Sequence, residues 1–130
     1  MAQQVRVEKL VTKEGNAMVV KGQAYSAMVT LSIEAADGSL TPSGWSTRKE
    51  AGGDGKPFTF TPGVNLIQGW TDGVIQLREG ERGLMHVPYT LGYGTAPQGS
   101  KGGAWYIPGS SNLLFDIEIL GKAGASEQEL

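Results

Sequence analysis

The chain has 130 residues, enough for one domain with one core, and its net charge of −2 gives no electrostatic reason to expect binding to nucleic acid or to a membrane surface. It contains no Cys, which excludes disulfides, thiolate metal ligands and Cys nucleophiles. No apolar run approaches the roughly 18 residues of a membrane span, and the first ten residues lack the pattern of a signal peptide. We therefore expect a cytoplasmic protein.

The first quarter of the chain predicts strands. A hydrophobic share of 39% and 20 glycines favour a β-rich fold with substantial loops. Residues 5–10 are a short strand candidate, and residues 13–16 contain a turn. Residues 23–34 give the clearest strand, because apolar side chains recur at every second position, as in a sheet with one buried face. The positions on that face are Tyr25, Ala27, Val29, Leu31 and Ile33.

Residues 35–55 lose this periodicity. Two Asp-Gly turn dipeptides and several further glycines fill the segment, and Trp45 stands alone within it. The pattern predicts one long loop of about twenty residues, and loops longer than about 12–15 residues are usually functional or disordered.

The next stretch predicts a short strand followed by the one convincing helix of the chain. Phe58 and Phe60 are two residues apart and would share a face of a strand, which a Pro-Gly pair at residues 62–63 then ends. From Asn65, a plausible N-cap, the period changes to that of a helix. The apolar stripe of this helix comprises Leu66, Ile67, Trp70, Val74 and Leu77.

The last third predicts two more strands, at residues 82–88 and 113–120, separated by a glycine-rich loop at residues 89–112 that holds Tyr93, Trp105 and Tyr106. Residues 122–130 have no periodic apolar signal and are expected to form a flexible tail after a single domain at residues 1–121. The expected fold class is α+β, an antiparallel sheet of about five strands wrapped round one short amphipathic helix.

The sequence offers little for acid–base or metal chemistry. The single His86 falls on the outer face of its strand, where we expect it to be exposed. The carboxylate pairs Glu79 with Glu81 and Asp116 with Glu118 lie in a turn and on an outward face, which predicts solvated charges. The glycines match neither a P-loop nor a dinucleotide motif. We therefore expect no metal site and no cofactor.

Aromatic residues remain as candidates for function. Six of them lie on the helix, on inward strand positions or in the loops at the strand ends: Phe58, Phe60, Trp70, Tyr93, Tyr106 and Phe115. They could form plain core, or they could line an apolar pocket closed by the two loops. A pocket of that kind would bind an apolar or proline-containing ligand.

Several sequence blocks, in order, resemble the FKBP-type peptidyl-prolyl cis-trans isomerases, the macrolide-binding immunophilins. They are KPFTF at residues 56–60, LIQGWTDGV at 66–74, GER at 80–82, VPYTLGYG at 87–94 and IPGSSNLLFDIEIL at 107–120, and the similarity covers residues 5–120. The resemblance implies a sheet wrapped round a short helix, with the active site between them. This agrees with the fold expected from periodicity.

The resemblance also implies site residues. Trp70 matches the floor of the family's pocket, Tyr93 its hydroxyl donor to a ligand carbonyl, and the backbone N–H of Ile67 a second donor. Tyr106 takes a place at the rim that is usually aliphatic. The apolar walls would come from Phe58, Leu66, Ile67, Ile107 and Phe115. The implied chemistry needs no acid or base, because a dry pocket disfavours the dipolar resonance form that resists rotation about an X–Pro bond.

Two positions depart from the family pattern. Val29 stands where the family usually has a pocket Tyr, and no Phe-Asp pair follows that strand; a loose alignment puts Trp45 with Ser46 in the place of that pair. The expected function is peptidyl-prolyl isomerisation, with reduced activity, on proline-containing peptides or proteins by a monomer that binds macrolides weakly. The alternative is a non-catalytic FKBP-like binding module or chaperone for apolar or proline-containing segments.

Overall fold

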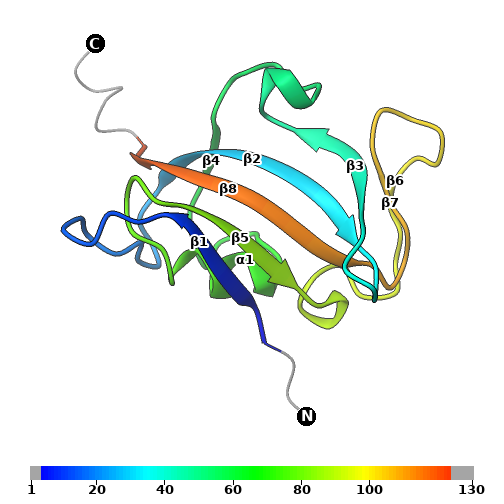
Figure 1. Cartoon of the computed structure of the whole chain (residues 1–130), viewed down its shortest axis with the longest axis horizontal. Helices are drawn as coiled ribbons and strands as arrows, with labels where there is room; N and C mark the ends of the chain where they lie inside the picture. Colours follow the sequence, from blue (N-terminus) through cyan, green and yellow to red (C-terminus); the bar gives the residue numbers. More distant parts are fainter. Residues whose placement is uncertain (1–3, 124–130) are drawn as a thin grey trace.

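The computed structural model describes residues 4–123 and is shown in Figure 1. Its strands and helices are, in order, β1 (Arg6–Val11), β2 (Tyr25–Glu34), β3 (Leu40–Ser46), the 3₁₀ helix η1 (Lys49–Ala51), β4 (Phe58–Phe60), α1 (Gln68–Val74), β5 (Arg82–Val87), the 3₁₀ helix η2 (Tyr89–Leu91), β6 (Gln98–Gly99), β7 (Tyr106–Ile107) and β8 (Asn112–Lys122). Within residues 4–123 no helix has the length and apolar character that crossing a membrane would require.

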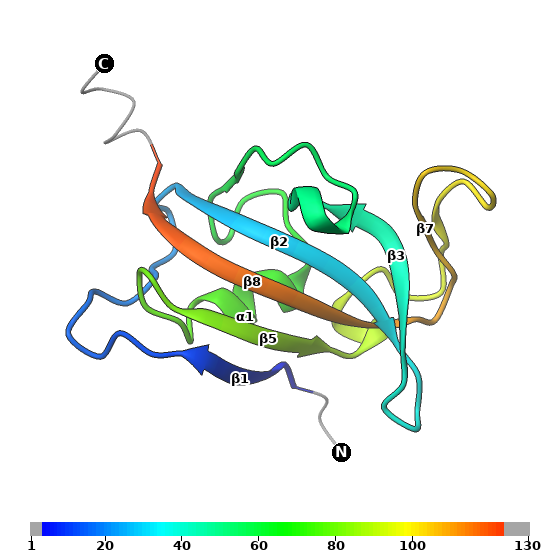
Figure 2. The same cartoon turned by 45° about the horizontal axis from the view of Figure 1, so that its top comes forward.

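Six strands form one antiparallel sheet in the order β1-β5-β8-β2-β3, with β4 also paired to β2. The long central strands β2 and β8 pair along their whole length, from Tyr25 opposite Lys122 to Glu34 opposite Asn112. The helix α1 lies behind β5 and β8 (Figure 2). The predicted α+β fold, a sheet wrapped round one short helix, is confirmed.

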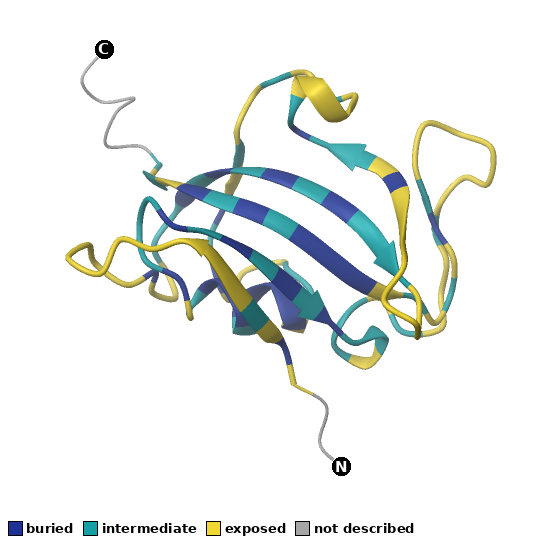
Figure 3. Ribbon diagram, in the orientation of Figure 1, coloured by how far each residue is buried: buried dark blue, intermediate teal, exposed yellow. Residues whose placement is uncertain are grey.

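The core lies between this sheet and α1. Burial alternates from Tyr25 to Leu31 in β2 and from Phe115 to Ile119 in β8, as the period of two predicted, and Figure 3 shows this as dark blue and teal bands. From α1 and the turn after it, Trp70, Val74 and Leu77 complete the core. The inward residues of a half-buried sheet and the stripe of an amphipathic helix thus meet in one cluster.

Two glycines let α1 approach the sheet closely. A Cβ atom on Gly69 would lie 2.3 Å from Cγ1 of Val87, and one on Gly73 would lie 2.6 Å from the sulfur of Met85. Both distances are too short for carbon, so a larger residue would have to displace the side chain of Val87 or Met85 or move the helix away from β5. These residues lower helix propensity, but they set the depth at which Trp70 sits.

The helix is shorter than predicted, and its expected N-cap was wrong. It begins at Gln68 after Ile67, whereas Asn65 has a positive φ of 52° and belongs to the preceding turn. Asn tolerates this left-handed backbone better than most residues, which explains why it fits both a cap and a turn pattern. A bond from the Gly63 N–H to the hydroxyl of Thr71 (3.0 Å) ties that turn to the helix.

The prediction of one long loop at residues 35–55 was also wrong, because β3 and η1 lie inside it. Pro42, Ser43 and Gly44 hide the strand pattern. Side-chain hydroxyls hold β3 to β2 where the register shifts: Ser43 Oγ donates to the Leu31 carbonyl (2.6 Å), and the Val29 N–H donates to Thr47 Oγ1 (2.9 Å). Such bonds depend on tertiary placement, which periodicity does not reveal.

The second long loop, at residues 89–112, contains η2 and the short hairpin β6–β7. This hairpin rests on β3 at Gly44, where an added Cβ would lie 2.2 Å from the carbonyl oxygen of Ala104. The last strand is longer than predicted, since Lys122 ends β8 and the Ala123 N–H donates to the Ala24 carbonyl. The rest of the predicted tail, residues 124–130, lies outside the described residues.

His86 is less exposed than predicted, although it does face outward. Its side chain is only 14% exposed, with Nδ1 2.9 Å from a Glu34 carboxylate oxygen and Nε2 2.6 Å from Glu8. The outward acids Asp116 and Glu118 pair with Arg82 and Arg48, respectively.

Glu81 is fully buried, which overturns the prediction of a solvated charge. The backbone N–H groups of Lys13 and Arg78 each donate to its carboxylate at 2.8 Å, and Lys9 Nζ lies 3.1 Å away. Burial alone would raise the pKa of Glu81, but these backbone donors and the Lys9 ammonium together outweigh it and hold the pKa below its usual value. The carboxylate thus ties its own turn, at residues 78–81, to β1 and the turn that follows β1.

Replacing Glu81 by Gln is expected to lower the free energy of unfolding at pH 7 by about 1.5–3 kcal/mol, the range for hydrogen bonds to charged groups. A carboxyl whose pKa is lowered by folding stabilises the fold above its unfolded pKa and loses that contribution as the pH falls through the folded value. The difference in unfolding free energy between wild type and Glu81→Gln, measured by urea unfolding, should therefore become smaller below about pH 4.

The control is Glu14→Gln, which removes an exposed carboxylate from the neighbouring turn. It should leave the free energy of unfolding unchanged both at pH 7 and below about pH 4. Equal losses of unfolding free energy in the two variants would contradict this role of Glu81. So would a difference between wild type and Glu81→Gln that does not depend on pH.

Replacing Gly44 by Ala is expected to loosen the β6–β7 hairpin, because the new Cβ collides with the backbone of Ala104. Gly102→Ala is the matched control: both glycines have a positive φ, 90° and 84°, but nothing lies within 4 Å of a Cβ on Gly102. The two variants share the left-handed strain of about 1–2 kcal/mol. Hydrogen exchange of residues 98–107 should accelerate more in Gly44→Ala, and equal exchange would show that the contact does not hold the hairpin.

Candidate active site

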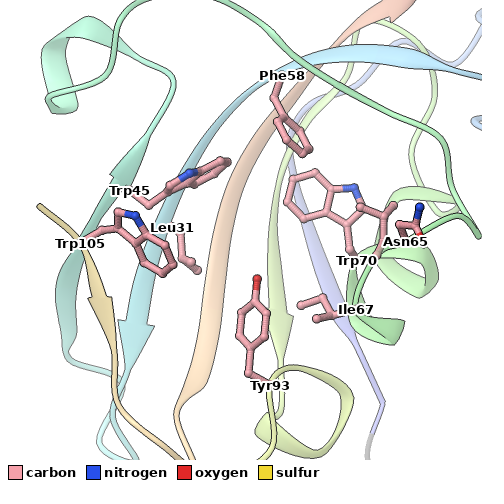
Figure 4. Close-up of a pocket in the computed structure, with 9 residues that line it drawn as sticks. Leu31, Trp45, Phe58, Asn65, Ile67, Trp70, Tyr93 and Trp105 are labelled. Carbon is pink, nitrogen blue, oxygen red and sulfur yellow. The ribbon is translucent and has the colours of Figure 1, made fainter. Parts of the chain in front are cut away.

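A cavity of about 310 Å³ opens between the start of α1, the strands β2 to β4 and the two long loops. This volume falls at the lower end of the range for pockets that hold small ligands, roughly 300–1,000 Å³. Figure 4 shows its lining side chains. They are predominantly apolar or aromatic: Leu31, Trp45, Phe58, Asn65, Leu66, Ile67, Trp70, Tyr93 and Trp105.

Trp70 forms the floor of the cavity and is fixed by three other rings. Its centroid lies 5.6 Å from that of Phe58, 5.4 Å from Phe60 and 4.9 Å from Phe115, with interplanar angles of 70–81°. These are edge-to-face contacts, a preferred geometry for aromatic pairs. With only 4% of its surface exposed, the indole is a rigid platform for a ligand.

Tyr93 brings a hydroxyl into the cavity. Its ring rises from the loop after η2, and the oxygen points between Trp70 on one side and Leu31 on the other (Figure 4). A tyrosine hydroxyl is protonated at neutral pH at its usual pKa, and burial raises the pKa of Tyr93 further, so the group can donate a hydrogen bond. Within residues 4–123 no protein group bonds to this hydroxyl, which leaves it free for a ligand.

Trp45 and Trp105 line the side of the cavity opposite Trp70 (Figure 4). Trp45 comes from β3 and meets Phe58 edge to face, with centroids 5.7 Å apart and planes at 87°. Ser46 beside it does not supply a polar contact to the cavity, because its Oγ bonds to Thr30 Oγ1 at 2.7 Å and to the Val29 carbonyl at 3.1 Å.

The structure brings most of the sequence-predicted site residues together. Trp70, Tyr93, Trp45, Phe58, Leu66 and Ile67 all line the cavity. Phe115 lies behind Trp70 and supports it, while Val29 and Ile107 are sealed in the core. Tyr106 is half-buried on β7 and does not line the cavity.

Three lining residues were absent from the predicted site: Leu31, Asn65 and Trp105. Leu31 could have been predicted, since it lies two residues after Val29 on the same inward face of β2. Trp105 directly precedes β7 and is the neighbour of the predicted Tyr106, which does not line the cavity. Nothing in the local pattern distinguished Asn65 from a helix cap.

The cavity has no charged lining residue among the described residues. Within the same residues, no group of three or more His, Asp or Glu side chains is arranged to hold a metal ion. The chemistry available is therefore apolar contact, one neutral hydroxyl donor, the Asn65 amide, backbone groups and the indole N–H groups, of which the buried Trp70 Nε1 has no hydrogen-bond partner among the described residues. The N–H of Ile67 is one of the backbone groups, because Ile67 precedes the hydrogen-bonded turns of α1 with extended backbone.

Solved structures share this fold. The crystal structure of AtFKBP13 matches with a TM-score of 0.71 and 32% sequence identity, over 92% of this chain and 93% of that one. The structure of the three FKBP domains of wheat FKBP73 matches with a TM-score of 0.72 but only 20% identity, covering 92% of this chain and 46% of that one. The second likeness shows the fold alone.

Sequence comparisons point the same way. The chain is 37% identical over 111 residues to the chloroplastic peptidyl-prolyl cis-trans isomerase FKBP13 of Arabidopsis thaliana, covering 80% of this chain and 49% of the relative. It is 43% identical over 68 residues to FK506-binding protein 2 of Dictyostelium discoideum, covering 52% and 47%. The chain thus spans about half the length of these curated relatives. Since the family model for FKBP-type peptidyl-prolyl cis-trans isomerase matches residues 15–120, the chain belongs to that family.

Proposed function

We propose that this chain accelerates cis–trans isomerisation of X–Pro peptide bonds in peptides or proteins. The observation that carries the proposal is the uncharged cavity in which a rigid indole floor faces a free hydroxyl donor. Rotation about the X–Pro bond meets a barrier of roughly 18–20 kcal/mol, because resonance gives the bond double-bond character. The site must therefore favour the twisted amide over the planar one.

The cavity favours the twisted amide by excluding water. A planar amide carries a larger dipole than a twisted one, so removal of water disfavours the planar ground state more. The prolyl ring packs on Trp70, and Phe58 and Ile67 enclose it. Interactions that are stronger in the twisted state than in the planar one lower the barrier, and no proton has to be transferred.

Tyr93 and Ile67 hold the peptide in place. The hydroxyl of Tyr93 donates to a peptide carbonyl beside the prolyl ring, and the N–H of Ile67 donates to a second carbonyl. Both groups are neutral, so they orient the peptide without opposing the apolar environment.

A second candidate is a binding module without turnover. It is favoured by the position of Val29, which is buried in the core, and by the hydroxyl of Ser46, which is engaged within the sheet. Neither of these two residues therefore offers a free hydrogen-bonding side chain to a ligand. Each lost hydrogen bond weakens the binding of a polar ligand such as a macrolide by about 0.5–1.5 kcal/mol, and we therefore predict weak macrolide binding. The monomeric state and the cytoplasmic location also stay predictions.

The test is an isomerisation assay on short X–Pro peptides. The wild-type protein should raise the rate above that of buffer, and Tyr93→Phe should lower kcat/KM by about 2- to 10-fold, since it removes one hydrogen bond and keeps the ring. Tyr89→Phe removes a hydroxyl outside the cavity and should leave the rate unchanged.

Trp70→Leu tests the floor of the site and should reduce kcat/KM further, since leucine lacks the flat indole. Near-UV circular dichroism and thermal unfolding would establish that each variant is folded. An unchanged rate in Trp70→Leu would contradict the site assignment. A wild-type rate equal to that of buffer would exclude the isomerase, and peptide binding in that same sample would support the binding module.

A further inference from the structure

The outer face of the sheet, away from the cavity, holds a histidine between two carboxylates. The imidazole of His86, on β5, lies between Glu34 on β2 and Glu8 on β1. Nδ1 is 2.9 and 3.1 Å from the two carboxylate oxygens of Glu34, and Nε2 is 2.6 Å from Oε1 of Glu8. These three side chains, hereafter the histidine bridge, link the edge strand β1 to β2 across β5 and β8.

The other charged groups around this ring are already paired. On β8, the residue opposite the ring is Leu114, which is only 6% exposed, and the next outward residue, Asp116, is bound by Arg82 through both oxygens at 2.9 Å. On β1, Arg6 donates to the Glu8 carboxylate at 2.8 Å. The two carboxylates of the histidine bridge are therefore the groups that respond directly to the charge of the ring.

A neutral imidazole cannot serve both carboxylates. It has one N–H, so it donates to one of them and turns a lone pair toward the other, whereas the protonated ring donates to both. Hydrogen bonds from Arg6 and from His86 hold the pKa of Glu8 below its usual value, so Glu8 is a carboxylate at neutral pH.

The contact with Glu8 is the one that the neutral ring gives up. Within residues 4–123, the Glu34 carboxylate bonds only to this ring, and its side chain is 22% exposed. The side chain of Glu8 is 48% exposed and also has Arg6 as a partner. Because Glu34 is the more buried carboxylate and has no second partner, the single proton of the neutral ring stays on Nδ1, facing Glu34.

The strand β1 has few other contacts at this end. It lies at the edge of the sheet, with β5 as its one strand partner among the described residues, and Figure 3 shows it as mostly exposed. Its apolar anchors are the half-buried Val7 and, just before the strand, Val5, whose Cγ1 would lie 3.2 Å from a Cβ on Gly73 of α1. The pair of Lys9 with Glu81 holds the opposite end.

We propose that the histidine bridge is a pH-sensitive clamp on β1, which the protonated ring of His86 closes and the neutral ring opens at Glu8. Histidine changes its charge between about pH 5 and 8. A hollow of about 240 Å³ lies beside the ring, so water can reach it and exchange its proton. The clamp is therefore closed in mildly acid solution, and β1 separates locally from β5 more often as the pH rises through neutral. It does not depend on the proposed isomerase activity.

The test is hydrogen exchange of the β1 amides, residues 6–11, at about pH 5.5 and about pH 8, expressed as protection factors to remove the intrinsic effect of pH. In wild type, protection of β1 relative to the amides between β2 and β8 should fall by about 2- to 5-fold at the higher pH, the effect of one exposed ion pair. His86→Gln should show the lower relative protection at both pH values. Glu8→Gln should lose the pH dependence, because an amide accepts from the protonated ring and donates to the neutral one.

Glu14→Gln is the matched control, since it removes an exposed carboxylate from the turn after β1, and it should keep the pH dependence of wild type. Equal protection of β1 at both pH values in wild type would overturn the proposal, and so would the same fall in His86→Gln. A loss of protection shared equally by β2 and β8 would also overturn it, because it would report unfolding of the whole domain instead of the release of one strand.

The ring can also be observed directly, because His86 is the single histidine of the chain. Nitrogen-15 NMR should show both ring nitrogens protonated at about pH 5.5 and the proton retained on Nδ1 at about pH 8. A ring that is already neutral at the lower pH would overturn the clamp. A neutral ring with its proton on Nε2 would do so too, because the bond to Glu8 would then persist and β1 would not be released.

Discussion

The close packing of α1 on β5 is the constraint on which the site depends. Gly69 and Gly73 bring the helix so near the sheet that Trp70 meets the rings behind and beside it, including Phe60 and Phe115. Larger residues would have to displace the side chains of Val87 and Met85 or move the helix, and a well-packed core tolerates either change poorly. The two glycines thus lower the helix propensity of α1, and the close packing that they allow keeps the floor of the cavity rigid.

The opposite side of the cavity is built differently, from segments without strong local patterns. The strand β3 is held by hydroxyl bonds from Ser43 and Thr47, and the β6–β7 hairpin rests on it at Gly44. These segments bring Trp45 and Trp105 to face Trp70. One side of the site is thus set by core packing and the other by loops, which are the parts of a domain that most often carry specificity.

Much of this arrangement could be predicted, and the failures have physical causes. The period-two pattern from Tyr25 to Leu31 and the helical stripe through Trp70 correctly indicated the sheet, the helix and the floor of the cavity. The strand β3 was missed because its residues show no apolar alternation, although backbone pairing with β2 and side-chain hydroxyl bonds hold it in place. Glu81 was taken for a solvated charge because its partners Lys9 and Lys13 lie far away in the sequence.

By itself, the sequence determined the fold class, the family resemblance and, largely through that resemblance, six of the nine residues that line the cavity. Periodicity is a local property, so it reports which face of an element is buried. Only the tertiary structure decided that Trp105 joins Trp45, that Val29 and Phe115 support the cavity without lining it, and that Glu81 is buried. Those outcomes depend on contacts between distant segments, and the spacing of residues along one segment does not contain them.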